Sequence, residues 1–160
     1  METFNSILTL LAIIGTGMIA GTFFVFSVAV MPAFRRLPGG AAMPSMQSIN
    51  VVIQNPMFLG VFMGTALISL ILAGMSIWTW NSPQTYYILA GATLYVVGRF
   101  LLTIVVNVPL NNALDAADPA SVNGQKVWSS YLSNWTFWNH IRTVASILST
   151  AAFALSYVRN

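Results

Sequence analysis

Charged side chains are scarce in this chain, which limits the surroundings in which it can fold. Only 6% of its 160 residues are charged, six basic and three acidic, while 57% are hydrophobic. Soluble domains carry about 25% charged residues, so these few charges cannot cover a surface that faces water. We therefore expect a single integral membrane domain, residues 1–160, whose main partner is the lipid bilayer.

The chain also lacks cysteine and has a single histidine, His140. The absence of cysteine excludes disulfides and thiolate metal sites. The net charge of +3 comes from scattered basic residues rather than from a patch, which argues against a nucleic-acid partner. No phosphate-binding loop, catalytic carboxylate pair or nucleophile elbow is present, so no motif predicts a cofactor.

Long apolar segments are what the sequence does contain. A membrane-spanning helix needs about 20 mostly apolar residues, and four segments meet this requirement: 7–30, 56–80, 83–106 and 136–158. The connection at 81–84 is short and flanked by Trp and Tyr, which is typical of a helical hairpin at a membrane interface. The expected fold is all-α, a four-transmembrane-helix bundle with two long loops on one side.

The two long connections, 34–55 and 107–134, are expected to lie together on the side opposite to the termini. In the first, Met46, Ile49 and Ile53 recur at helical spacing, which predicts a short amphipathic helix along the membrane surface. Pro44 is expected in the first turn of this helix.

Basic residues predict the orientation in the membrane. Arg35, Arg36 and Lys126 lie on the loop side, whereas Arg159 lies on the terminal side. The positive-inside rule then places both long loops in the cytoplasm and both termini outside. A bacterial inner membrane is the expected location.

Glycine spacing suggests where helices approach one another. Gly17 and Gly21, and likewise Gly60 and Gly64, form small-xxx-small patterns that allow close helix packing in lipid. The expected use is packing within the bundle. The alternative is a homo-oligomer that associates through the same glycines.

Polar residues form rows on two of the predicted spans. Arg99, Thr103 and Asn107 are spaced i, i+4, i+8 and share one helix face. In the last span, Asn139 belongs to a second polar face, with His140 beside it. Both rows begin at the loop-side end, so they are predicted to meet in a polar cleft that opens toward the loops and is roofed by Trp135 and Trp138.

Arg99 and His140 each have a functional and a structural interpretation. An arginine at the centre of a spanning helix costs about 2.5–3.5 kcal/mol on the insertion scale. Arg99 either stabilises an anion or orients a substrate, or it bonds helix-end carbonyls or pairs with Asp115 or Asp118. His140 either satisfies a neighbour, acts as a general base, or ligates haem or a metal, for which one histidine is a poor complete site. The tryptophans near it are either interfacial anchors or a platform for a flat ligand.

Five segments resemble the anthrone oxygenase-like family of small four-helix membrane proteins, most bacterial members of which are described only as a domain of unknown function. The segments are FSVAVMP at 26–32, MQSIN at 46–50, NP at 55–56, NVPLN at 107–111 and WTFWNHIR at 135–142. The resemblance extends over residues 14–148. It implies a membrane enzyme that oxidises an anthrone to an anthraquinone with molecular oxygen.

The resemblance also implies roles for individual residues. The motifs carry over His140 as the base that forms a substrate carbanion, and Arg142, Asn107 and Asn111 as groups that stabilise the developing oxyanions. From position we add Arg99 to this catalytic group. We also expect substrate binding by Trp135, Trp138, Asn139 and Thr103.

This scheme needs a small flat lipophilic substrate and no cofactor. Two alternatives stay open. One is a non-enzymatic binding or helper protein for a lipid, a quinone or a partner helix. The other is a haem- or metal-dependent oxidoreductase in which His140 is the ligand.

Overall fold

The computed structural model of the chain describes residues 2–37, 39–78, 80 and 83–159. All regular secondary structure in these residues is helical. Within this part of the chain, four helices are long and apolar enough to cross a membrane. The predicted all-α bundle of four spanning helices is therefore confirmed.

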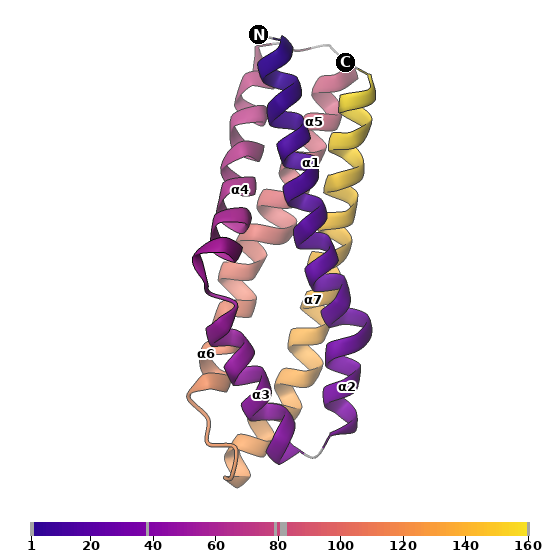
Figure 1. Cartoon of the computed structure of the whole chain (residues 1–160). Helices are drawn as coiled ribbons and strands as arrows, with labels where there is room; N and C mark the ends of the chain where they lie inside the picture. The colour runs from indigo at the N-terminus through magenta and orange to yellow at the C-terminus, as the bar shows by residue number, and fades with distance from the viewer. Residues whose placement is uncertain (1, 38, 79, 81–82, 160) are drawn as a thin grey trace.

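Two of the four spanning helices are built from several helical segments (Figure 1). The first run is α1 (Glu2–Val25), the π-helical η1 (Phe26–Val30) and α2 (Met31–Arg36). The helix α3 (Gly39–Val52) then leads to the second span, α4 (Pro56–Ile77). The third run is α5 (Pro83–Tyr95), the π-helical η2 (Val96–Leu101) and η3 (Thr103–Asn107), and α6 (Val108–Asp115), and the last helix is α7 (Val122–Val158).

The two long connections lie at the same end of the molecule, as predicted. Figure 1 shows the start of α1, the end of α4, the start of α5 and the end of α7 at one end of the molecule, and α2, α3 and α6 gathered at the other. The side of the membrane on which each end lies stays a prediction.

Three helical runs continue well beyond the thickness of a bilayer. The helix α7 has 37 residues and is about 55 Å long, against about 30 Å of hydrocarbon. The prediction of a loop over 107–134 is wrong, because α6 extends to Asp115 and α7 already begins at Val122. A polar helix persists outside the membrane when its inner face packs against other helices, and this packing is present here.

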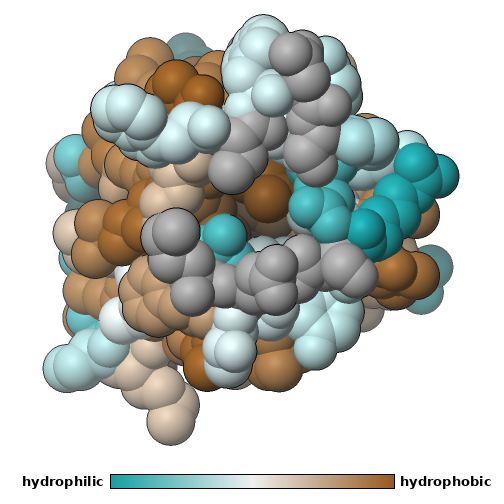
Figure 2. Space-filling view, turned by 90° about the horizontal axis from the view of Figure 1, so that it is seen from above, coloured by the Kyte–Doolittle hydropathy of each residue, from teal (hydrophilic) through white to brown (hydrophobic). Residues whose placement is uncertain are grey.

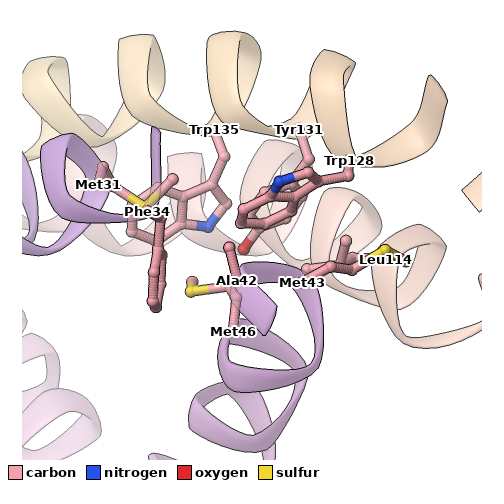
Figure 3. Packing of buried hydrophobic residues seen from close by; sticks show 9 residues of the cluster. All are labelled: Met31, Phe34, Ala42, Met43, Met46, Leu114, Trp128, Tyr131 and Trp135. Atoms are coloured by element: carbon pink, nitrogen blue, oxygen red, sulfur yellow. The ribbon is translucent and has the colours of Figure 1, made fainter. Parts of the chain in front are cut away.

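The extramembrane halves of these runs form a second helical section with its own core. Met31, Met46 and Leu114 are at most 1% exposed, and they meet Trp128 and Trp135 from α7 in one cluster (Figure 3). Because Met46 packs on α7 and α6 rather than on lipid, the prediction that its helix lies along the membrane surface is wrong. Its start is also earlier than predicted, at Gly39, so that Pro44 lies inside the helix.

Capping residues define the two helix starts nearest this section. The side chain of Asn55 caps α4, where its Oδ1 accepts a hydrogen bond of 3.0 Å from the backbone N–H of Phe58. The Oγ of Ser121 accepts one of 2.9 Å from the N–H of Gly124 and caps α7 in the same way. Both residues are preferred N-caps, and the Asn55 cap separates α4 from α3.

The membrane section is apolar outside and has a mixed interior, in which buried hydroxyl groups lie beside two apolar clusters. Met18, Leu67 and Val144 are more than half exposed on the outer surface, and Figure 2 shows hydrophobic residues around much of the perimeter at the terminal end. Inside, hydroxyl groups bond across helices, as between Thr150 and Thr16 at 2.9 Å. An apolar outer surface with polar contacts between the helices fits a bundle that has lipid as its solvent.

The closest helix packing uses glycines other than the predicted ones. A Cβ atom on Gly15 would overlap the Oγ1 of Thr65, and one on Gly98 would lie 2.9 Å from the Cβ of Ala145. In contrast, a Cβ on Gly21, Gly60 or Gly64 would have nothing within 4 Å. The predicted packing role is wrong for these three glycines, because no other helix approaches them closely. The homo-oligomer alternative stays a prediction.

We expect Gly15→Ala to lower the free energy of unfolding by about 1–3 kcal/mol, because the added methyl group overpacks the contact between α1 and α4. Gly64→Ala is the matched control on α4, and it should be neutral or slightly stabilising because its new methyl group meets open space. Unfolding in mixed micelles of increasing denaturing detergent measures both. Equal stability of the two variants would contradict a close approach of α1 and α4 at Gly15.

Candidate functional site

A cavity of about 240 Å³ lies where the membrane section meets the second helical section, beside the break between α3 and α4. Its walls come from the first, third and last helical runs together with α3 and α4. The charged side chains among its described lining residues are Arg99, Arg142 and Asp115. Aromatic rings make up much of the remaining wall, from Phe23, Phe26, Phe58, Phe62 and Trp135.

A second cavity, of about 210 Å³, lies at the terminal end of the bundle. It is lined by residues such as Asn5, Thr9 and Tyr157, and none of its described lining residues is charged. The chemistry that distinguishes a site therefore gathers in the cavity that holds the two arginines.

Arg99 and Arg142 reach this cavity from different helices and meet at one hydroxyl group. The Nη1 of Arg99 and the Nη1 of Arg142 donate hydrogen bonds of 3.0 and 3.2 Å to the Oγ1 of Thr103. That hydroxyl in turn donates to the carbonyl oxygen of Arg99 at 2.7 Å. Thr103 thus has its one proton and both lone pairs engaged, and it fixes the spacing of the two guanidinium groups.

The two guanidinium groups are buried and incompletely paired. Arg99 is 0% exposed and Arg142 is 1% exposed. Among the described residues, neither forms an ion pair with a carboxylate, and the Nε and Nη2 of Arg99 and the Nε of Arg142 have no hydrogen-bond partner. A buried charge without a partner is costly, so this arrangement favours the binding of an anion.

An aromatic ring supports both arginines. The Cζ of Arg99 lies 3.5 Å from the centroid of the Phe23 ring, and that of Arg142 lies 5.1 Å from it. Arg142 also lies 5.3 Å from the ring of Trp135. Contacts between a cation and an aromatic face are attractive and strengthen when water is excluded, which partly offsets the burial of the charge.

Irregular helix geometry surrounds the cavity. The π-helical segments η1, η2 and η3 contain or adjoin Phe26, Arg99 and Thr103, all of which line it. Such turns are rare and occur mainly at functional sites, because the extra residue redirects side chains. Here they bring Arg99 and Thr103 onto the cavity wall.

The amide of Asn111 holds the wall on the loop side. Its Oδ1 accepts hydrogen bonds from the Oη of Tyr131 at 2.8 Å and from the Nε1 of Trp135 at 3.0 Å. Tyr131 and Trp135 stack with ring centroids 5.9 Å apart. Asn111 lines the cavity, but its oxygen is already shared by these two donors.

Asn139 and Asn107 are buried behind the cavity wall. The Oδ1 of Asn139 accepts a hydrogen bond of 3.1 Å from Arg142, while its Nδ2 donates to the Oγ of Ser27 at 2.8 Å. Asn139 therefore orients Arg142 rather than lining the cavity. Asn107 is 1% exposed, and neither atom of its amide has a hydrogen-bond partner among the described residues.

The structure does not bring His140 into this cavity. His140 is exposed, whereas Arg142 is buried, because residues two positions apart on a helix point to nearly opposite sides. The placement of both in one cleft is therefore wrong. Trp138 is partly exposed and is likewise absent from the cavity lining. No group of three His, Asp or Glu side chains suited to a metal occurs in the described residues.

Comparison with known proteins adds to this geometry. The family model for anthrone oxygenase matches residues 55–152, which is more than half of the chain. The chain belongs to the anthrone oxygenase family. No curated protein and no solved structure matches it.

The part that matches the anthrone oxygenase family contributes 12 of the 19 described residues that line the cavity. Arg99, Thr103, Asn111, Trp135 and Arg142 all lie within residues 55–152. The wall contributed by α1 and α3 lies outside this segment and completes the site in the folded chain.

Most of the described residues that line the cavity were not predicted as site residues from the sequence, and Phe23 and Asn50 are two of them. Asn50 lies one turn after Met46 on the apolar face of α3, and it donates from Nδ2 to the Oδ1 of Asp115 at 3.4 Å. The sequence could have indicated Asn50, because it is a polar residue on a helix face whose other residues are apolar. Phe23 carried no comparable signal, since its role depends on arginines from two other helices.

Proposed function

We propose that this member of the anthrone oxygenase family is a membrane-embedded oxygenase that acts on a small, flat, lipophilic anthrone or phenolic substrate. The observation that carries the proposal is the pair of buried arginines with unpaired N–H groups, which face a cavity with aromatic walls. Positive groups fixed in a water-poor site stabilise negative charge that develops during a reaction.

The reaction follows from the chemistry of an anthrone. Loss of a proton from the central methylene gives an enolate, whose negative charge is stabilised by the nearby guanidinium groups of Arg99 and Arg142. The enolate carbon transfers electrons to O₂ and forms a C–O bond, which gives a peroxide. Cleavage of the O–O bond with loss of the second methylene proton gives the ketone and one water. The balance is anthrone plus O₂ to anthraquinone plus H₂O.

The arginine pair replaces His140 as the centre of this scheme. By stabilising the enolate, the two guanidinium groups favour deprotonation, and the proton leaves to water at the mouth of the cavity. Thr103 fixes the two groups, and Trp135 and Phe23 support a flat ring system. No bound cofactor is required for these steps.

The direct test is oxygen uptake by the purified protein in nanodiscs with 1,8-dihydroxyanthrone. We expect quinone formation well above the spontaneous rate, with equal consumption of O₂ and substrate. An argon atmosphere and heat-inactivated protein are the controls. A rate that never exceeds spontaneous oxidation for anthrones and related phenols would refute the proposal. It would favour the alternative of a binding protein, which is consistent with the lack of an imidazole among the described lining residues.

We expect His140→Ala to change kcat/KM by less than about twofold, since an exposed side chain outside the cavity contributes little to turnover. The measurement is the same oxygen uptake, and stability is followed in parallel. Loss of activity in a folded His140→Ala variant would restore the histidine as a base and contradict a central role of the arginines.

A further inference from the structure

The inner end of the cavity carries two positive charges that the described residues leave uncompensated. Arg99 and Arg142 share the hydroxyl of Thr103 as a common acceptor, so both are held in one place. Three of their nitrogen atoms remain without a partner. A ligand that binds in neutral form would leave these charges uncompensated in the bound complex until the reaction begins, whereas a ligand that is already an anion compensates them as soon as it binds.

The geometry points to a ligand that is already an anion when it binds: a flat aromatic monoacid, held by its carboxylate or phenolate between Arg99 and Arg142. This inference deepens the proposed function and rests on the same cavity. It adds the charge, the orientation and the route of entry of the substrate.

The shape and lining of the cavity favour a flat aromatic molecule over a lipid chain. Its volume of about 240 Å³ is below the range of about 300–1,000 Å³ that is usual for ligand pockets, so the ligand must be small. The rings of Phe26, Phe58 and Phe62 line the cavity together with those of Phe23 and Trp135. Aromatic walls of this kind bind planar rings by stacking.

Asp115 explains why the ligand should carry only one acidic group. Among the described lining residues it is the one acidic side chain. Thr103 and Asp115 lie on the same continuous helical run, Pro83–Asp115, and twelve residues separate them by roughly 15–18 Å. A fused-ring acid that binds the arginines therefore extends toward this carboxylate, which would repel a second negative charge.

The rim of the cavity suggests that the ligand enters from the membrane. Leu59, Ile104 and Val108 line the cavity and are 36%, 47% and 40% exposed. Gln54 and Asp115 form a polar part of the same lining. An edge that is apolar on one side and polar on the other matches the boundary between lipid and water, where amphiphilic aromatic acids concentrate.

The test is a set of ligands with one ring system and different charges. 2-Anthracenecarboxylate, 2-anthracenemethanol and anthracene-2,6-dicarboxylate are titrated into the protein in nanodiscs at neutral pH, and binding is followed by quenching of tryptophan fluorescence. Empty nanodiscs correct for partitioning into lipid. We expect the monoacid to bind about 10- to 100-fold more tightly than the alcohol, and the diacid to bind as weakly as the alcohol.

Two variants assign these differences to residues. Arg99→Met should reduce the affinity for the monoacid to that for the alcohol, whereas Asp115→Asn should raise the affinity for the diacid to about that for the monoacid. Equal binding of acid and alcohol to the wild type would overturn the inference, as would tight binding of the diacid. Palmitate that binds as tightly as the aromatic acid would overturn the assignment to flat ligands.

The outcome is separable from that of the proposed function. Selective binding of the monoacid without oxygen uptake would support the inference and refute the oxygenase. Oxygen uptake with neutral anthrones and no preference for the acid would support the oxygenase and refute the inference of an anionic ligand.

Discussion

Arg99→Met should give a protein that is more stable than the wild type and about 100- to 1,000-fold less active. The loss of activity follows from the removal of one of two positive groups that stabilise the bound oxyanion, an effect of this size for a single donor. The gain in stability follows from the burial of Arg99 without a carboxylate partner among the described residues. Replacement of buried ion pairs by apolar side chains of similar volume is often neutral or stabilising by about 1–4 kcal/mol, and a buried charge without a carboxylate partner should gain at least as much from it.

A loss of activity together with a gain in stability would show that Arg99 serves the reaction rather than the fold. Oxygen uptake measures the first, and unfolding in denaturing detergent measures the second. Arg99→Lys, which keeps the charge but loses the planar group, should lie between the wild type and Arg99→Met in activity. Arg36→Met is the matched control, because Arg36 is exposed at the end of α2. An Arg99→Met variant that is both inactive and less stable would show that the arginine serves the fold.

Thr103→Val should lower kcat by about 10- to 100-fold while the protein stays folded. Valine has nearly the shape of threonine, but it removes the oxygen that accepts hydrogen bonds from both Arg99 and Arg142. Without this common acceptor the two guanidinium groups lose their fixed spacing, and a displacement of about 1 Å is enough to cost a factor of this size. Two more buried N–H groups would also lose a partner, so a destabilisation of about 1–3 kcal/mol is expected.

Recovery of activity in a variant that keeps the hydroxyl group would identify Thr103 as a positioning residue. Thr103→Ser keeps the hydroxyl group and should recover most of the activity, although it has one methyl group fewer than the wild type. Thr93→Val, on an exposed position of α5, is the matched control and should behave like the wild type. If Thr103→Val were fully active, the shared hydrogen bonds would have no part in catalysis.

The number and placement of the spanning helices followed from the sequence alone. Apolar segments of sufficient length are a local property, and so are the Asn55 cap and the turn before Ser121. The row of Arg99 and Thr103 was also predictable, because a spacing of four residues places two side chains on one face of any helix.

The sequence predicts only in part which face of α7 points into the bundle. Helix geometry alone shows that His140 and Arg142 cannot both face one cavity, but it does not say which of them points inward. That choice is made by packing. Asn139 turns inward to bond Ser27 and the carbonyl oxygen of Phe23 on the first helical run, and this contact brings Arg142 in and leaves His140 outside.

The second helical section and the completed cavity were decided by tertiary structure. Nothing local stops a helix at the membrane boundary, and α6 and α7 continue because their inner faces bury Leu114 and Trp128 against α3. The cavity needs Phe23, Asn50, Arg99 and Arg142 from four separate helices. Sequence determines what each helix presents on its faces, whereas the meeting of those faces depends on contacts between residues far apart in the chain.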